Sequence, residues 1–249
     1  MPHDRIVELS AKRAVFCFVF LCWVHPAAGQ DLGTLLSRFE SDHDTEMQTQ
    51  ALRDIGRNYR DTAGPGLFKI ALRTKDAQTK WLAIGALGEL KFQKAAPFIV
   101  SCLRDDNPQV RRASALALSK VEDSSSVPAL IELLKDEHDT EVVKWTAVAL
   151  ASQGAKASVP MLKSRAHDGA TETRMAIIQS IGILGGRGEV PYLVTFLDDK
   201  DEFVAIVAAR MIEGYAGQDF AWCGKETCGL QERIRRVKTW WQAHSSSWK

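Results

Sequence analysis

Histidines beside carboxylates are the side chains of this 249-residue sequence with the most direct potential for metal or acid–base chemistry. His43 and His138 are each followed by Asp, in the segments DHDTE and EHDTE. Asp followed by Thr at such a point most simply caps the start of a helix, and two turns so distant along the chain are not expected to share a metal. No Walker loop, dinucleotide-binding glycine motif or nucleophile elbow occurs. The sequence therefore predicts no catalytic residue, no metal site and no cofactor.

Residues 1–29 have the pattern of a secretory signal peptide. Arg5, Lys12 and Arg13 precede the apolar run AVFCFVFLCWV, which is followed by a proline and small residues. A run of this length, at 1.5 Å per residue, covers about half of a ~30 Å hydrocarbon core, which disfavours a permanent membrane span. We expect export to the periplasm or the extracellular space with cleavage after Gly29, and the alternative is a retained N-terminal anchor.

Two cysteines near the C-terminus lie close together in the sequence. Cys223 and Cys228 occur in the stretch WCGKETCGL, and an exported protein meets an oxidising compartment. We expect a local disulfide between them, because the alternative of a zinc knuckle needs four ligands and this loop supplies fewer. Cys102 lies in the apolar helical pattern PFIVSCLRD and is predicted to be a buried, unreactive thiol.

Prolines recur along the chain with a nearly constant period. Pro97, Pro128, Pro160 and Pro191 are separated by 31, 32 and 31 residues, and Pro65 lies 32 residues before the first of them. In this alignment the residue ten before the proline and the residue two after it are always Leu or Ile, and the residue nine before it is always small. Self-similarity at such a period is the signature of a solenoid.

Each repeat is predicted to contain two helices, a helix A followed by a helix B. Stretches such as WLAIGALGEL and RASALALSKV carry apolar residues at helical spacing, with almost no strand alternation. The proline falls in the first turn of helix B, where its missing N–H is harmless. We expect the small residues to let neighbouring A helices approach closely, and the Leu and Ile positions to fill the seam between layers.

Residues 105–136 resemble short HEAT repeats of the phycobilisome-lyase type, in the segment DDNPQVRRASALALSKVEDSSSVPALIELLKD. Residues 76–105 resemble them more loosely. The resemblance covers about residues 44–213. It implies an all-α fold, a right-handed α-α superhelix of about six helical hairpins with capping helices at both ends. Such repeats serve unrelated functions, so a phycobilin-lyase-like enzyme or a metal-dependent oxidoreductase stays as the alternative to a non-catalytic role.

The segments outside the repeats are expected to be caps that cover the open ends of the stack. Residues 30–43 include the amphipathic stretch DLGTLLSRFES, and residues 214–249 include the cysteine loop and the helix LQERIRRVKTWWQAH. The C-terminal segment resembles the closing segment of exported bacterial HEAT-repeat proteins, in which a GxDF turn precedes a helix ending in a Trp pair. The matching residues are Gly217, Asp219, Phe220, Trp240 and Trp241. We expect the Trp pair to pack within the cap.

Charged residues recur in the turns between repeats. Asp105 precedes Arg111 by six residues, and Asp168 precedes Arg174 by six. These positions resemble the Asp–Arg ladder of HEAT repeats, which connects one turn to the next. In the fourth repeat valines take the place of the arginine, so we expect the ladder to be interrupted there.

The candidate binding surface lies on the B helices. Residues one and four after each proline are expected to share one face that points away from the core, and in HEAT-like stacks the B helices line the concave side. The candidate binding residues are Phe98, Ser101, Glu132, Met161, Ser164, Tyr192 and Thr195, and Ala129 belongs to the same row. Phe, Met and Tyr are residue types that anchor partner segments. The alternative is that these side chains fill gaps between adjacent B helices.

The function predicted from the sequence is that of an exported, non-catalytic scaffold that binds a protein or peptide partner. The formal net charge is +1, from 32 Lys and Arg against 31 Asp and Glu, which argues against a general electrostatic affinity for nucleic acids or anionic membranes. The candidate row contains Glu132 and no Lys or Arg, so a nucleic-acid partner is not expected.

Overall fold

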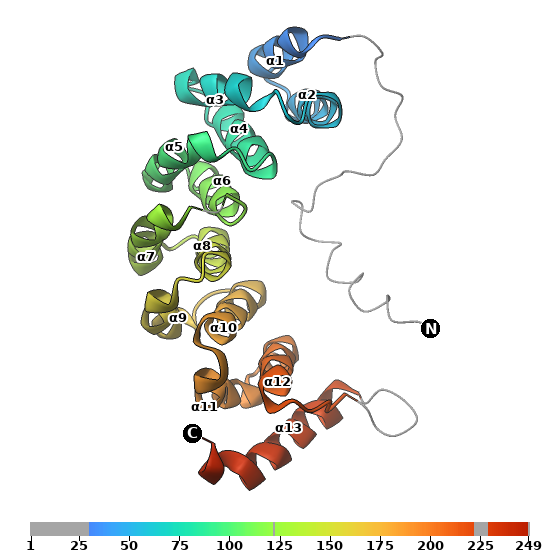
Figure 1. Cartoon of the computed structure of the whole chain (residues 1–249), viewed down its shortest axis with the longest axis vertical. Helices are drawn as coiled ribbons and strands as arrows, with labels where there is room; N and C mark the ends of the chain where they lie inside the picture. The colour runs from blue at the N-terminus through green and yellow to red at the C-terminus, as the bar shows by residue number, and fades with distance from the viewer. Residues whose placement is uncertain (1–29, 122, 222–228, 249) are drawn as a thin grey trace. The chain divides into compact units, whose positions relative to one another are not determined.

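The computed structural model of the protein describes residues 30–121, 123–221 and 229–248, and all regular secondary structure in these ranges is helical (Figure 1). The α-helices are α1 (Leu32–Ser41), α2 (Thr45–Asn58), α3 (Gly64–Arg73), α4 (Ala77–Glu89), α5 (Ala96–Ser101), α6 (Pro108–Leu118), α7 (Val127–Asp136), α8 (Thr140–Ser152), α9 (Val159–Arg165), α10 (Thr171–Gly185), α11 (Val190–Val194), α12 (Glu202–Ala216) and α13 (Leu230–His244). Short 3₁₀ turns flank the B helices: η1 (Gln93–Ala95), η2 (Cys102–Arg104), η3 (Ser124–Ser126), η4 (Lys156–Ser158), η5 (Gly186–Glu189) and η6 (Thr195–Asp198); η7 (Ser245–Ser247) follows α13.

The described chain divides into two compact units, one ending at Arg60 and the other beginning at Asp61. In the first unit α1 packs against α2, and the side-chain amide of Gln48 in α2 donates a 3.0 Å hydrogen bond to the carbonyl of buried Phe39 in α1. Asp44 caps α2 by accepting hydrogen bonds from two backbone N–H groups of its first turn. The cap expected in the DHDTE turn is therefore confirmed.

The second unit is a two-layered stack of helical hairpins (Figure 1). The A helices α4, α6, α8, α10 and α12 form one layer, in which each packs directly on the next. The B helices α3, α5, α7, α9 and α11 form the other layer, and each carries its proline in the first turn. This arrangement confirms the predicted all-α solenoid. Within the described ranges, no helix is both long enough and apolar enough to cross a membrane.

Repeating apolar side chains fill the seam between the two layers. All Leu and Ile residues at the two repeat positions of this unit are buried: Leu67, Leu87, Ile99, Leu118, Leu130, Leu150, Leu162, Ile181 and Leu193. The small positions allow close helix contacts, because a Cβ atom on Gly88 would lie only 2.6 Å from the Cα of Ala117 in the next A helix. The Ser180 hydroxyl of α10 donates to the Ala147 carbonyl of α8 at 3.0 Å. Close approach of A helices, as expected, sets the stack's spacing.

Ion pairs connect one turn of the stack to the next, as expected. The Arg111 guanidinium forms a bidentate pair with Glu137 at 2.7 and 3.0 Å, and Arg174 pairs with Asp199 at 2.6 and 2.9 Å. The carboxylates thus lie 26 and 25 residues after their arginines, not six before. The ladder thus runs from one turn to the next, as the resemblance implied, and each arginine pairs with the carboxylate that follows its own hairpin. An A–B hairpin returns the chain to the edge where helix A began, so the carboxylate that follows helix B is within reach.

Of the two aspartates that precede the arginines, Asp105 forms the equivalent pair one step earlier in the stack, whereas Asp168 does not. Asp105 pairs with Lys80 of the previous repeat at 2.9 Å and offers Arg111 only its backbone carbonyl. Asp168 pairs with Arg165. In the fourth repeat Val143 is buried at the position that the arginine has in other repeats. The ladder is interrupted there, as expected. Arg165 from α9 contacts the turn after α7 there, with hydrogen bonds to two backbone carbonyls.

The C-terminal end of the stack is covered by α13 and an aromatic cluster. α13 packs on α12, and Glu213 of α12 pairs with Arg233 of α13. The ring centroids of Phe220 and Trp240 lie 5.9 Å apart, and Trp240 also contacts Trp241. The expected packing of the Trp pair within the cap is therefore observed. Cys223 and Cys228, and the signal-peptide segment, lie outside the described residues.

The contact between Gly88 and Ala117 predicts opposite effects for two glycines of α4. Gly88→Ala places a methyl group against the next helix, so overpacking should outweigh the gain in helix propensity and lower the free energy of unfolding by about 1–2 kcal/mol. A Cβ atom on Gly85 meets nothing within 4 Å. Gly85→Ala should therefore raise the free energy of unfolding by about 0.5–1 kcal/mol. Urea unfolding of both variants measures the two signs. Equal effects would contradict close packing of α4 on α6.

The Glu137 pair predicts a pH-dependent contribution to stability. Burial acts to raise the pKa of Glu137, but hydrogen bonds from Arg111 and from the following backbone N–H groups outweigh it, so the pKa lies below its ordinary value of 4.5. A lowered folded-state pKa stabilises the fold above the unfolded-state pKa, and this contribution is lost as the pH falls through the lower folded value.

Glu137→Gln should therefore lower the free energy of unfolding by about 2 kcal/mol at pH 7. The difference in this free energy between the variant and the natural sequence should shrink as the pH falls below about 4.5. Chemical unfolding between pH 7 and pH 3 measures this difference. Glu132→Gln is the control, because this side chain is exposed and has no ion pair in the described structure; it should change stability by less than about 0.5 kcal/mol. A difference that is constant with pH would exclude a charged Glu137 as the cause.

Candidate binding site

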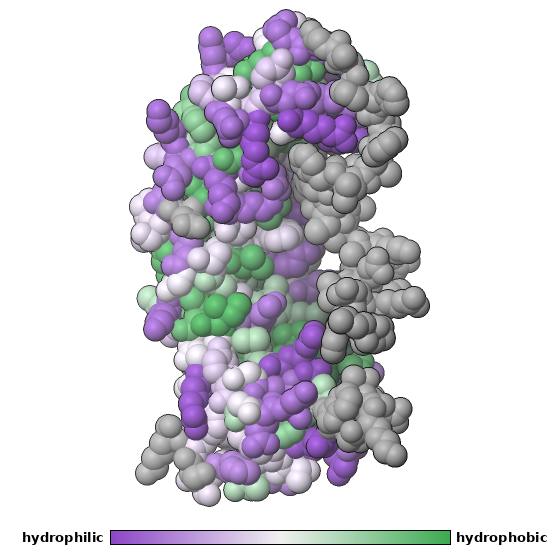
Figure 2. Space-filling model, turned by 45° about the vertical axis from the view of Figure 1, so that its right-hand side comes forward, coloured by the Kyte–Doolittle hydropathy of each residue, from purple (hydrophilic) through white to green (hydrophobic). Residues whose placement is uncertain are grey.

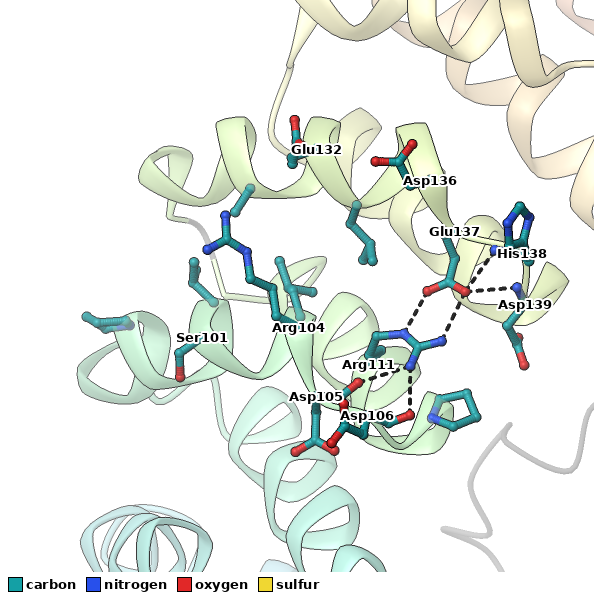
Figure 3. A pocket seen from close by; sticks show the side chains of 16 residues that line it. Ser101, Arg104, Asp105, Asp106, Arg111, Glu132, Asp136, Glu137, His138 and Asp139 are labelled. Carbon is teal, nitrogen blue, oxygen red and sulfur yellow. Dashed lines mark hydrogen bonds and ion pairs between the residues drawn. The ribbon is translucent and has the colours of Figure 1, made fainter.

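A hollow of about 960 Å³ lies between the B helices α5 and α7, with η2 and the turns that follow both helices (Figure 3). Apolar side chains from the two helices, Val100, Leu103 and Leu133, form part of its lining. Polar side chains surround them: Ser101, Arg104, Asp105, Asp106, Arg111, Glu132, Asp136, Glu137, His138 and Asp139. Figure 3 shows Arg104 extending into the space between the two helices, while the Arg111–Glu137 pair closes one end.

The structure brings two of the candidate residues together at this hollow. Ser101 on α5 and Glu132 on α7 both line it, as does Ala129 from the same repeat row. Both Ser101 and Glu132 are exposed. Met161, Ser164, Tyr192 and Thr195 lie on α9, α11 and η6, at later steps of the stack. The row is therefore spread along successive B helices, and this hollow includes only its earlier part.

The hydroxyl groups of the row are bonded within their own helices. Ser101, Ser164 and Thr195 each donate to the backbone carbonyl three residues earlier, at 2.6 to 2.7 Å. All three residues are exposed. A partner would therefore meet hydroxyl oxygens that are available as acceptors, since their protons are already engaged.

The two aromatic members of the row make contacts between adjacent B helices. Phe98 of α5 packs on Phe68 of α3 with ring centroids 5.8 Å apart. The Tyr192 hydroxyl of α11 donates to the Lys163 carbonyl of α9 at 3.1 Å, and burial, with the nearby charge of Glu189, raises the pKa of Tyr192. Both side chains are half-buried. These contacts are those expected if aromatic residues of the row fill gaps between helices.

The charges around the hollow are only partly compensated. Glu137 is nearly buried at 6% exposure and accepts hydrogen bonds from Arg111 and from the N–H groups of His138 and Asp139, at 2.7 to 3.0 Å. The hydrogen bonds and charge of Glu137 raise the pKa of Arg111 above its ordinary value. The pair therefore forms a fixed, internally neutral end of the hollow.

Three of the other lining carboxylates face solvent. Asp106, Glu132 and Asp136 are exposed and form no ion pair in the described structure, and Asp139 caps α8 through its carboxylate. Arg104 is the corresponding cation on the lining, exposed and also without an ion pair there. Three exposed carboxylates without ion pairs thus face one such guanidinium, so the rim of the hollow is acidic.

Sequence reasoning missed several of these lining residues. Arg104, Asp136 and His138 lie at the ends of B helices and in the following turn, whereas the candidate row was limited to one and four residues after each proline. The signal that identifies them in the sequence is the recurrence of charged residues in these turns. Within the described ranges, no group of three or more His, Cys, Asp and Glu residues is placed to hold a metal ion.

Exposed apolar side chains elsewhere in this unit occur singly. Leu72, Ile183, Phe203 and Leu230 are 39 to 60% exposed and lie on four different helices. In Figure 2 the hydrophobic areas on the visible face are interrupted by hydrophilic ones. Scattered apolar residues of this kind are usual on protein surfaces, so the hollow between α5 and α7 is the stronger candidate for binding.

Comparison with known proteins relates the chain to two proteins with different names and roles. Phycocyanobilin lyase subunit alpha from Nostoc sp. is 28% identical over 128 residues, which are 51% of this chain and 39% of the lyase subunit. The 26S proteasome regulatory subunit RPN2 from Eremothecium gossypii is 26% identical over 141 residues, 54% of this chain and 15% of that protein. The chain therefore spans well under two thirds of the length of either relative.

A solved structure and a family profile agree on the fold. The structure of the complex of CpcE and CpcF of phycocyanin lyase from Nostoc sp. matches with a TM-score of 0.61 and 19% identity, over 89% of this chain and 98% of the solved chain. The profile of HEAT repeats matches residues 64–151 and 141–213, together more than half of the chain. The period of the prolines, the two helical layers and this match show that the chain belongs to the HEAT-repeat family.

Proposed function

We propose that this protein is a non-catalytic scaffold that binds a protein partner through the surface of its B helices. The observation that carries the proposal is the hollow between α5 and α7, which lies on that surface and has the size typical of ligand sites in proteins. Its apolar lining with a polar rim is the usual anatomy of a recognition site. The packed stack behind it holds these side chains in place, so binding orders few groups.

The charge of the rim supports a protein partner rather than a nucleic acid. Asp106, Glu132 and Asp136 are exposed on the rim of the hollow, and Arg104 is the one Lys or Arg among its lining residues that has no ion pair. Phosphate groups are repelled by such an excess of carboxylates, whereas basic side chains of a protein are attracted.

A role in bilin chemistry is the second candidate, favoured by the match to phycocyanobilin lyase subunit alpha. That match covers 39% of the lyase subunit, and the solved lyase structure is itself a complex of two chains. A lyase-like role would require added phycocyanobilin to change its absorption spectrum on mixing with the protein. Under the scaffold proposal the spectrum stays the same.

Export and the disulfide are part of the same proposal. The signal-like residues 1–29 support delivery to an oxidising compartment, where Cys223 and Cys228 would be joined. The protein recovered from a bacterial periplasm should begin at Gln30, and its intact mass should increase by two hydrogens on reduction. A chain that keeps its first residues and stays in the membrane fraction would support the anchored alternative instead.

The scaffold proposal predicts cross-linking from one face of the stack. A photo-reactive residue introduced at Glu132, Ser164 or Thr195, which are exposed on the B side, should cross-link a single protein in cells. The same residue at Glu172 or Gln179, exposed on the A helix α10, should give no such product. Mass spectrometry of the cross-linked band identifies the partner, and binding of the purified partner is then measured directly.

The control positions decide the interpretation of this experiment. Cross-links of equal yield from both faces would show random contact and contradict the proposal, as would the absence of any product from the B side. Binding of the purified partner should also weaken as salt rises, because the rim is charged.

A further inference from the structure

Side chains between adjacent B helices determine whether the stack is closed or open at each step. Between α9 and α11, Tyr192 donates to the Lys163 carbonyl, and the Lys163 ammonium lies 4.8 Å from the centroid of the Tyr192 ring. Phe196, which is buried, stacks on His167 with ring centroids 4.8 Å apart. Aromatic side chains therefore occupy the space between the B helices at this step.

The step from α5 to α7 carries smaller residues at the same repeat positions. One residue after its proline α7 has Ala129, where α11 has Tyr192. Five residues after the proline the chain has Leu133, where the later repeat has Phe196. Ala129 and Leu133 both line the hollow. Between α5 and α7 the space that aromatic side chains fill between α9 and α11 is thus a hollow, which Arg104 enters from the repeat position of His167.

Large side chains also bridge the two remaining steps. Phe98 of α5 packs on Phe68 of α3. Arg165 of α9 reaches the carbonyls of Leu134 and Glu137, at the end of α7 and just after it. The position directly after the proline is Phe98 in α5, Met161 in α9 and Tyr192 in α11, whereas it is Ala129 in α7 and Gly66 in α3. Among the steps from α5 to α11, Ala129 is therefore the departure from large side chains that opens the hollow.

We infer that the hollow between α5 and α7 is a docking site for one aromatic side chain of a partner protein, which takes the place that Tyr192 occupies between α9 and α11. The inference rests on the proposed scaffold role and adds the chemistry of the partner. Val100 occupies the repeat position of Lys163, so its carbonyl corresponds to the acceptor of the Tyr192 hydroxyl. The volume of about 960 Å³ exceeds that of one aromatic ring, so the residues flanking the aromatic one enter too.

The charges of the rim define these flanking residues as basic. Glu132 and Asp136 project from α7 and Asp106 from the facing turn, all exposed and without ion pairs in the described structure. Arg104 alone opposes them. Lys or Arg on either side of the aromatic residue would find carboxylates on both walls, whereas an acidic segment would be repelled. The partner segment is therefore an aromatic residue within a short basic stretch.

Defined peptides test this inference on the purified protein. The probe is the acetylated and amidated peptide GKKYKKG, and the two control peptides carry Ala in place of its Tyr or Glu in place of its four Lys. Titration at low salt, followed by ¹⁵N NMR, should show binding of the first peptide and at least tenfold weaker binding of both controls. Absence of any binding of GKKYKKG at millimolar concentration would overturn the inference.

Substitutions at the opened position locate the peptide. Ala129→Tyr restores the side chain that α11 has and should weaken binding of GKKYKKG at least tenfold, with a melting temperature equal to or above that of the natural sequence. Ala129→Ser is the matched control, because it keeps the hollow open, and should bind within twofold of the natural sequence. If Ala129→Tyr lowers the melting temperature, Leu133→Phe fills the same space from the neighbouring repeat position and carries the same expectation.

The outcomes separate this inference from the proposed function. Unchanged peptide binding by both filled variants would show that the aromatic residue binds elsewhere and would overturn the inference, even if cross-linking finds a partner on the B side. Conversely, loss of peptide binding in the filled variants supports the hollow's chemistry even where no cellular partner cross-links, and only the scaffold proposal then fails.

Discussion

The close spacing of successive A helices is the constraint on which the rest of the second unit depends. Gly88 lies so near Ala117 that no side chain fits between them, and the Ser180 hydroxyl reaches a carbonyl of the neighbouring helix. This contact brings the Leu and Ile positions of adjacent repeats into one buried seam. It also fixes how far each B helix lies from the next, because every B helix is held on its own A helix by that seam. The B helices cannot move together to close a gap, so the size of their side chains decides what stays open.

Charged residues in the turns act on the same edge of the stack. Arg111 is held between the carbonyls of the preceding turn and the carboxylate of Glu137 in the following one. A guanidinium with this many partners ties together the start and end of its own hairpin, and it also forms the end wall of the hollow. The charges that stabilise the repeat are thereby satisfied internally. Those left over at the rim, on Glu132 and Asp136, are the ones that a partner can use.

The sequence was sufficient for most of the fold, because the fold repeats. The spacing of prolines, the buried Leu and Ile positions, the small residues and the Asp caps each recur, and each has one physical explanation that the structure bears out. The ladder partners were not predictable in the same way, because Arg111 has a carboxylate six residues before it and another 26 residues after it. Only the return of the chain through helix B decides between them. The hollow is not evident from the sequence, because large side chains are the ones that indicate anchoring residues, whereas the hollow originates at the small residue Ala129.

The relatives indicate where specificity must lie in such a protein. A lyase subunit and a proteasome subunit both match this chain over about half of its length, although their printed names describe different tasks. Positions that define the repeat are buried and cannot touch a partner, so overall identity mostly measures the shared scaffold. Positions one and five residues after the proline differ between steps of the B layer, from Tyr192 and Phe196 at one step to Ala129 and Leu133 at another. A departure from the repeat at these positions changes the surface without disturbing the seam. Proteins that share a partner with this one should therefore be sought by a small residue at the position of Ala129 with carboxylates around it, rather than by the similarity of their repeats.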